Sequence, residues 1–273
     1  TRDEPADGVG RGGDASGAEV ARFAAIHEGR GAFAFTPRVG ESYRIELDRP
    51  AGNSQRFELP AAREGGAVLA ASDEVVGAGA PARFEIGSGT GRTVRLALAR
   101  REVEVASREV ALEAGVVAAV AVPLGAEVEG VLRATLYDGP TPLAERLVFR
   151  RPSRRVHVSA TATPERGTPG SRVALEIRTT DDAGKPVAAV VGIAVTDDAV
   201  LQQIEPRRRA PRLPVQVLLA NEVGELADAH VYLSDSPDAP RALDLLLGTQ
   251  GWRRFAFATP AAFVAEHGDA ARR

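Results

Sequence analysis

Short runs in which apolar and polar residues alternate occupy the first part of the chain. Phe33 and Phe35 fall on one face of residues 31–36, and the same alternation recurs at residues 42–47 and 56–60. Alternation with period two, bounded by glycine and proline, predicts β-strands with one buried face. These strands are too few to close a sandwich, so we expect them to be the C-terminal part of a sandwich domain.

A denser series of strand-like runs lies between residues 63 and 150. The predicted strands are residues 67–71, 82–86, 93–99, 101–105, 108–112, 116–123, 130–138 and 143–150. Turn residues recur at a spacing of roughly 8–12 positions, which is typical of an antiparallel β-sandwich. The length of this block suits one immunoglobulin-sized domain.

A third block begins near residue 151 and changes character after Pro214. Strands are predicted at residues 155–160 and 173–178, and residues 187–195 are apolar on both faces, as in a central strand. After Pro214 the apolar residues follow the i, i+3, i+4 spacing of an amphipathic helix. The positions on this helical stripe are Val215, Leu218, Leu219, Val223 and Leu226.

A second helix is predicted from Ser236 and Pro237, because serine caps a helix and proline suits its first position. Its stripe consists of Leu243, Leu246 and Leu247, and Gly248 suits its end. The only tryptophan, Trp252, is expected to pack with these leucines and to dock the helix on the third sandwich.

These patterns predict a mainly β chain: tandem Ig-like antiparallel β-sandwiches, the last with a helical insertion. Residues 1–18 are rich in glycine, aspartate and alanine without periodicity, so they are predicted to be a linker or disordered. The further predicted divisions are part of a sandwich at 19–62, a sandwich at 63–150, a sandwich at 151–258 with its helical insertion at 205–251, and a tail at 259–273.

Composition narrows the classes of function. The chain has 273 residues, a formal net charge of −3 and no cysteine, which excludes disulfides, thiolate metal sites and cysteine nucleophiles. Charges of both signs are interspersed, which argues against nucleic acid as a partner, and no apolar run approaches the roughly 18 residues of a membrane-spanning helix. Methionine is absent, so we expect Thr1 not to be a translation start and the chain to be a fragment or a processed product.

Several sequence segments resemble those of one family, the bacterial α-2-macroglobulin-like proteins. They are residues 184–187 (GKPV), residues 195–201 (VTDDAVL), in which Ala199 replaces the usual serine, and residues 246–255 (LLGTQGWRRF). The residues that carry this structural signature are Asp197, Asp198, Leu201, Leu246, Leu247 and Trp252. The resemblance implies macroglobulin domains in series, neighbouring macroglobulin domains of the same protein as partners, and a periplasmic, cell-envelope or extracellular location.

In the inhibitor branch of this family, a protease cuts an exposed segment inserted in such a sandwich, and a thioester elsewhere captures it. The resemblance therefore implies a non-catalytic segment of an endopeptidase inhibitor that acts by protease entrapment, with proteases as partners. A cell-surface structural module, or one linked to outer-membrane transport, is the alternative, and the Trp-Arg-Arg-Phe ending favours it. A thioester motif elsewhere in the gene would favour the inhibitor, and a receptor plug and barrel would favour the alternative.

One arginine-rich segment is a candidate protease-accessible loop. Its basic residues are Arg207, Arg208, Arg209 and Arg212. Pro206, Pro211 and Pro214 keep such a segment out of a helix, and accessible loops are where proteolysis concentrates. An ordinary solvated loop is the simpler interpretation, and composition favours it, since only Lys185 is lysine among 34 basic residues.

Other polar groups are predicted to be structural. Asp181 with Asp182, and Asp197 with Asp198, supply too few ligands for calcium and are interpreted as turn and capping residues. The histidines, His27, His157, His230 and His267, show no metal-ligand spacing. We therefore expect no enzyme activity, no cofactor and no metal site.

Overall fold

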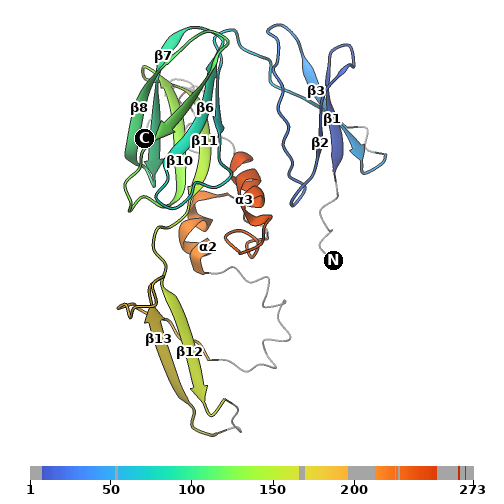
Figure 1. The fold of residues 1–273 in the computed structure, drawn as a ribbon. Coiled ribbons are helices and arrows are strands. Elements are labelled where there is room, and N and C mark those ends of the chain that lie inside the picture. The colour runs from blue at the N-terminus through green and yellow to red at the C-terminus, as the bar shows by residue number, and fades with distance from the viewer. Residues whose placement is uncertain are drawn as a thin grey trace. The chain divides into compact units, whose positions relative to one another are not determined.

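The computed structural model describes residues 8–52, 55–165, 170–195, 213–224, 226, 228–250, 264 and 268. The fold is mainly β, as predicted, and its strands form antiparallel sheets with a few helical segments (Figure 1). The chain divides into two compact units. Unit 1 comprises residues 1–151 and 208–273, and unit 2 comprises residues 152–207.

Unit 1 begins with a four-stranded sheet in the order β2-β1-β3-β4. The bounds are β1, Val9–Asp14; β2, Glu19–Ala24; β3, Tyr43–Arg49; and β4, Arg56–Glu58. The prediction of a linker or disorder over residues 1–18 is wrong for β1, which lies between β2 and β3 and pairs with both.

β1 was not predicted from the sequence because it is rich in glycine and shows no alternation of apolar and polar side chains. A Cβ at Gly10 would lie 2.5 Å from Cζ of Phe23, and one at Gly12 would lie 3.5 Å from the ring of Phe33. The rings of Phe23 and Phe33 therefore cover β1 at two positions where its glycines have no side chain.

Residues 31–36 do not form the predicted strand, although Phe33 and Phe35 do pack together as predicted. Phe33 stacks on Phe23 with ring centroids 5.4 Å apart and on Phe35 at 5.8 Å, and Phe35 meets the ring of Tyr43 at 5.0 Å. The segment is held by this row of aromatic contacts and not by a strand ladder.

Two antiparallel sheets follow and share one apolar core. One has the order β5-β6-β9 and the other β11-β10-β7-β8. The bounds are β5, Ala67–Ala71; β6, Ala82–Ser88; β7, Arg92–Arg100; β8, Val103–Leu112; β9, Val117–Val122; β10, Gly130–Asp138; and β11, Thr141–Arg150. Phe84 and Ile86 of the first sheet pack in the same buried cluster as Leu96, Leu132 and Val148 of the second. We call this pair of sheets the two-sheet block.

One boundary within the two-sheet block differs from the sequence prediction. Residues 101–105 and 108–112 were expected to be separate strands, but β8 is continuous from Val103 to Leu112. The chain turns instead at Arg101 and Glu102, which both adopt the left-handed conformation, with φ of 46° and 68°. Such a two-residue hairpin turn usually contains asparagine or glycine, so neither residue type signalled it.

Strands β10 and β11 are buried on both faces. Leu132 and Val148 point into the core of the two-sheet block, whereas Val131, Leu147 and Phe149 belong to a second apolar cluster. That second cluster is completed by the helical segments α2 (Leu213–Leu218), η2 (Ala220–Glu222) and α3 (Ala239–Gly248). The helices therefore cover the outer face of β10 and β11 (Figure 1).

This arrangement corrects the expected docking of the helices on the third block. The described helical leucines pack on strands of residues 130–150. The physical reason is that period-two alternation leaves apolar side chains on the outer face of β10 and β11, and these need a cover. The apolar stripe is buried as predicted, with Val215, Leu219 and Val223 in the cluster and Leu218 and Leu226 beside it. The continuous helix that this stripe predicted does not form: α2 ends at Leu218, η2 covers only Ala220–Glu222, and Val223 is extended, with φ of −121° and ψ of 143°.

Helix α3 begins later than predicted. It starts at Ala239 with Pro240 in its first turn, and Ser236 lies in the preceding turn, where its carbonyl accepts a hydrogen bond from the Ala239 N–H at 3.1 Å. Its end at Gly248 agrees with the prediction. Among the described residues, none of the helices has the length and apolar character needed to cross a membrane.

Unit 2 contains a two-stranded antiparallel ribbon of β12, His157–Thr163, and β13, Ala174–Thr180. The central strand expected at residues 187–195 does not form. Only its start pairs with β13, through a bridge between Thr180 and Pro186 and a bond from the Val187 N–H to the Thr179 carbonyl at 3.0 Å. Beyond that point Val190 and Val195 are almost fully exposed, so no layer of the described residues packs over this stretch to hold it as a strand.

Candidate functional site

Most of the residues selected from the sequence lie outside the described residues. They are Asp197, Asp198, Leu201, Arg207, Arg208, Arg209, Arg212 and Trp252. The two described members of the structural signature, Leu246 and Leu247, are buried in the cluster between α3 and β11. Their role in packing, which the sequence predicted, is therefore seen directly.

The turn role predicted for Asp181 is also seen. Its Oδ1 accepts hydrogen bonds from the N–H groups of Ala183 and Lys185, both at 2.9 Å. Asp182 has a further contact, since its Oδ1 lies 2.9 Å from Nε2 of His157 across the ribbon. This contact lies on the exposed surface, at the end of the ribbon where β12 begins and β13 ends.

The structure brings together polar residues that the sequence kept apart. His27, which follows β2, and His230, in the turns before α3, flank the carboxylate of Asp228. Each histidine has one ring nitrogen 3.9 Å from an oxygen of Asp228: Nε2 of His27 from Oδ2, and Nδ1 of His230 from Oδ1. The ring of Tyr232 meets that of His27 edge to face, with centroids 5.5 Å apart. We call these four residues, with Arg30, the His27 cluster.

Burial controls the chemistry of the His27 cluster. Tyr232 is fully buried, and its hydroxyl has no hydrogen-bond partner. Nε2 of His27 and one terminal nitrogen of Arg30 are likewise buried without one. Desolvation lowers the pKa of His27, opposed in part by the Asp228 carboxylate, and burial raises the pKa of Tyr232. The imidazole of His27 is therefore neutral near neutral pH.

Backbone strain marks the same cluster. Glu28, Asp228 and Leu233 all have positive φ, at 48°, 52° and 61°. Non-glycine residues adopt this conformation at a cost, and it persists only where the surroundings impose it. Sequence analysis missed the cluster because His27 and Asp228 are far apart in the chain and no local motif contains both.

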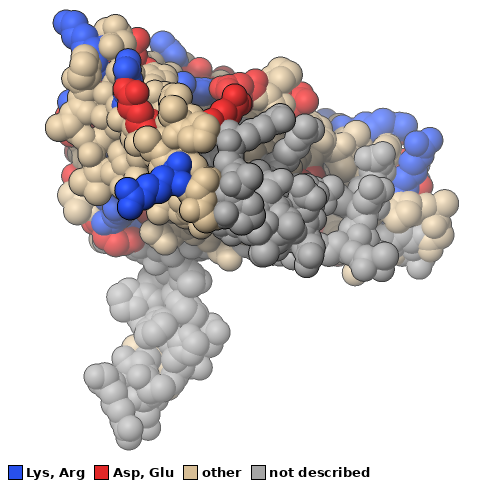
Figure 2. Space-filling view, turned by 90° about the horizontal axis from the view of Figure 1, so that it is seen from below, with Lys and Arg blue, Asp and Glu red and all other residues tan. Residues whose placement is uncertain are grey.

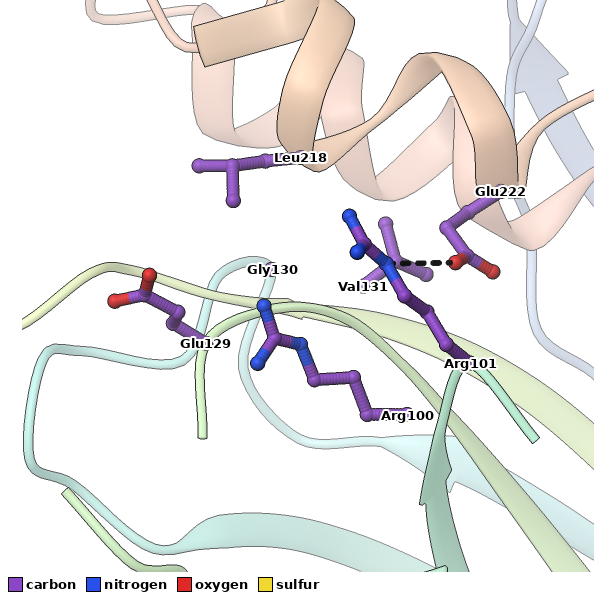
Figure 3. A pocket seen from close by; sticks show the side chains of 7 residues that line it. All are labelled: Arg100, Arg101, Glu129, Gly130, Val131, Leu218 and Glu222. Atoms are coloured by element: carbon purple, nitrogen blue, oxygen red, sulfur yellow. Dashed lines mark ion pairs between the residues drawn. The ribbon is translucent and has the colours of Figure 1, made fainter. Parts of the chain in front are cut away.

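A shallow pocket lies elsewhere, between the β7–β8 turn, the start of β10 and the helices (Figure 3). Its lining residues are Arg100, Arg101, Glu129, Gly130, Val131, Leu218 and Glu222. Arg101 extends from the turn to the helical segment, where it donates to the Val217 carbonyl at 3.1 Å and lies 4.0 Å from Glu222. We interpret this pocket as part of the contact surface between α2 and the sheet, which the hydrogen bond from Arg101 to α2 stabilises.

Charges and possible metal ligands set further limits. Figure 2 shows basic and acidic side chains side by side on the face that it presents. Among the residues that the structure describes, no group of three or more His, Asp or Glu side chains is placed to hold a metal ion. The His27 cluster is thus best described as a buried polar contact between two distant segments of unit 1.

Comparison with known proteins assigns this chain to no family. A scan against models of known protein families found no match, and a search of curated proteins found no relative of this chain.

Proposed function

We propose that this chain is a non-catalytic scaffold segment of an extracellular or cell-envelope protein of the α-2-macroglobulin-like kind. In this proposal the two-sheet block is an Ig-like macroglobulin sandwich, and the protein inhibits endopeptidases by entrapment. The resemblance of residues 184–187, 195–201 and 246–255 supports it, and the mainly antiparallel β structure is consistent with it.

One observation carries the proposal: unit 2 interrupts unit 1. The chain leaves unit 1 after Arg151 and re-enters it at Arg208. The sequence of the returning connection contains Arg207, Arg208, Arg209 and Arg212. An insertion that is tethered at both ends and carries cleavable residues at one of them has the topology that a cleavage trigger requires.

Cleavage at that position has a clear physical consequence. An intact unit 2 is joined to unit 1 at two points, which restricts the positions it can reach. A cut after one of the four arginines leaves unit 2 attached only through Pro152. The segment then gains conformational freedom without losing any part of the chain. Capture of the protease by a thioester requires a cysteine, and this chain contains none, so its proposed role is scaffold and trigger.

Limited digestion tests the trigger. The protein is treated with a low ratio of trypsin, and the first products are identified by intact mass spectrometry. We expect the first cut after Arg207, Arg208, Arg209 or Arg212, and a variant with all four changed to glutamine should survive several times longer. The matched control changes Arg154 and Arg155, in the outgoing connection, to glutamine and should leave the first cut in place. A first cut elsewhere in the wild-type protein contradicts the trigger.

Entrapment is tested on the full-length protein. A trapped protease is shielded from large substrates but remains open to small ones. We expect trypsin treated with the protein to lose activity on a large protein substrate while retaining its activity on a small peptide amide. Unchanged activity on both substrates would contradict entrapment and favour the structural or transport-linked module.

A further inference from the structure

The ribbon of unit 2 has one open edge. β13 has neighbours on both sides, since β12 pairs along its whole length and Pro186 with Val187 pairs at the end of its other side. β12 has one neighbour among the described residues. Within the part of the chain that the structure describes, nothing pairs with the backbone groups along the outer side of β12, which can therefore pair with another strand.

The edge of β12 lacks the features by which proteins usually protect open edges. Such features are charged side chains, proline, bulges and very short strands. β12 has seven residues, none of them proline, lysine, arginine, aspartate or glutamate. Its register with β13 runs without interruption from His157 opposite Thr180 to Thr163 opposite Ala174. This edge is a regular template for another strand.

An added strand would also increase the stability of the ribbon. Its alternation places Val158, Ala160 and Ala162 on the same face as Leu175 and Ile177. Much of this apolar face is exposed, with Val158 at 55% and Leu175 at 45%. A two-stranded ribbon is marginally stable in water, and added strands with a shared apolar face stabilise it.

The sequence of β12 is chemically symmetric about Ala160. Ser159 and Thr161 on either side both carry hydroxyls, Val158 and Ala162 are both apolar, and His157 and Thr163 are both polar. A strand that reads alike in both directions pairs with its own copy in an antiparallel manner without opposing unlike groups. A two-fold axis through such a pair gives a closed, self-complementary interface.

We propose that β12 pairs antiparallel with β12 of a second copy of this chain, around a two-fold axis at Ala160. In this register Ser159 lies opposite Thr161 of the second copy, and Val158 opposite its Ala162. The two ribbons become one sheet in the order β13-β12-β12-β13 with a continuous apolar face. Hydroxyl pairs of the Ser–Thr type, directly opposite one another, are favourable cross-strand contacts. The inference does not depend on the proposed function.

Two oppositely charged variants test the register. One carries Ser159→Glu with Thr161→Glu, and the other carries Ser159→Lys with Thr161→Lys. Within the ribbon, position 159 faces Arg178 and position 161 faces Glu176. Each variant therefore gains one favourable and one unfavourable contact inside the chain, so their intrachain effects are matched. Across the two-fold axis, each variant places like charges opposite one another twice.

Sedimentation equilibrium measures the dimer Kd. We expect the wild-type protein to dimerise and each charge variant alone to bind itself at least about tenfold more weakly. An equimolar mixture of the two variants should dimerise again, because glutamate then faces lysine at both positions. Circular dichroism checks that each variant is folded.

A third variant keeps the test decisive if one of these fails to fold. Ser159→Glu with Thr161→Lys forms favourable pairs both within the ribbon and across the axis, so it should dimerise at least as well as the wild type. A wild-type protein that stays monomeric at millimolar concentration overturns the proposal. So does a dimer that is insensitive to the charge variants, since its contact then lies elsewhere.

Discussion

Arg146 on β11 and Asp244 on α3 form an ion pair that fastens the helix to the sheet. Their side chains are only 16% and 18% exposed. A second arginine, Arg241, approaches the other oxygen of Asp244 at 3.4 Å. Because an ion pair is directional, this pair specifies one position of α3 on β11 in a way that the packing of the neighbouring leucines alone does not.

Removing the charge of Asp244 should destabilise the protein. Asp244→Asn keeps the shape but leaves the guanidinium of Arg146 largely buried without its counter-charge. We expect a loss of about 1.5–3 kcal/mol in the free energy of unfolding, measured by urea denaturation. As a control, Arg22→Gln breaks the surface pair with Glu19, whose side chains are 62% and 40% exposed, and should cost at most about 1 kcal/mol. Equal losses in both variants would contradict the special role of the buried pair.

Arg150, the last residue of β11, should be among the most sensitive positions in the two-sheet block. Its side chain is buried and donates to the carbonyls of Ala80, Gly125 and Val128 at 3.1, 2.6 and 2.6 Å. Arg150→Met fills similar space but leaves three carbonyls without this donor, at about 1–3 kcal/mol each. We expect a total loss of at least about 3 kcal/mol in urea denaturation. A loss below about 1 kcal/mol would show that other contacts hold the segments that contain Ala80, Gly125 and Val128.

Gly10 should tolerate no side chain. A Cβ there would lie 2.5 Å from the ring of Phe23 and 2.6 Å from the carbonyl oxygen of Glu46. Gly10→Ala should therefore lower stability by about 1–3 kcal/mol through overpacking. Gly13 lies in the same strand, and its Cβ would lie at an ordinary 3.6 Å from the nearest atom. Gly13→Ala is the matched control and should change the unfolding free energy by about 0.5 kcal/mol or less in thermal or urea denaturation. Similar losses in both variants would contradict the packing of Phe23 on β1.

His27 should make the protein less stable as the pH falls. Burial lowers its pKa in the folded state below the ordinary value of 6.5. The unfolded chain then binds the proton more readily, so the stability that neutral His27 provides is complete above pH 6.5 and declines as the pH falls below it. The decline levels off below the folded-state pKa.

The measurement compares wild type with His27→Gln by urea denaturation at several pH values from neutral down to pH 5. We expect the wild type to lose stability below about pH 6.5 and the variant to lose less. Tyr232→Phe, which removes a buried hydroxyl but no group that titrates in this range, should keep the wild-type slope. A wild-type slope in His27→Gln would mean that another group titrates there.

Local patterns determined most of the β-strands. In the two-sheet block, β5 and β10 have the predicted bounds. In β5 more buried and more exposed residues alternate, so the period of two is visible in the sequence, whereas β10 is an apolar segment buried on both faces and bounded by turn residues. The helical stripe of Leu243, Leu246 and Leu247 was likewise visible, since these leucines share one buried face. In both cases the pattern within a few neighbouring residues was sufficient.

Contacts between distant segments decided the rest. β1 is a strand because Phe23 and Phe33 cover its glycines, and residues 187–195 are not a strand because no described layer faces them. The helices pack on β10 and β11 because those strands have apolar outer faces, and the His27 cluster exists because His27 and Asp228 meet in space. The sequence by itself determined which segments have an apolar face. Only the tertiary structure decided what each face contacts, because the free energy of burial depends on the partner surface, and any part of the chain can supply that surface.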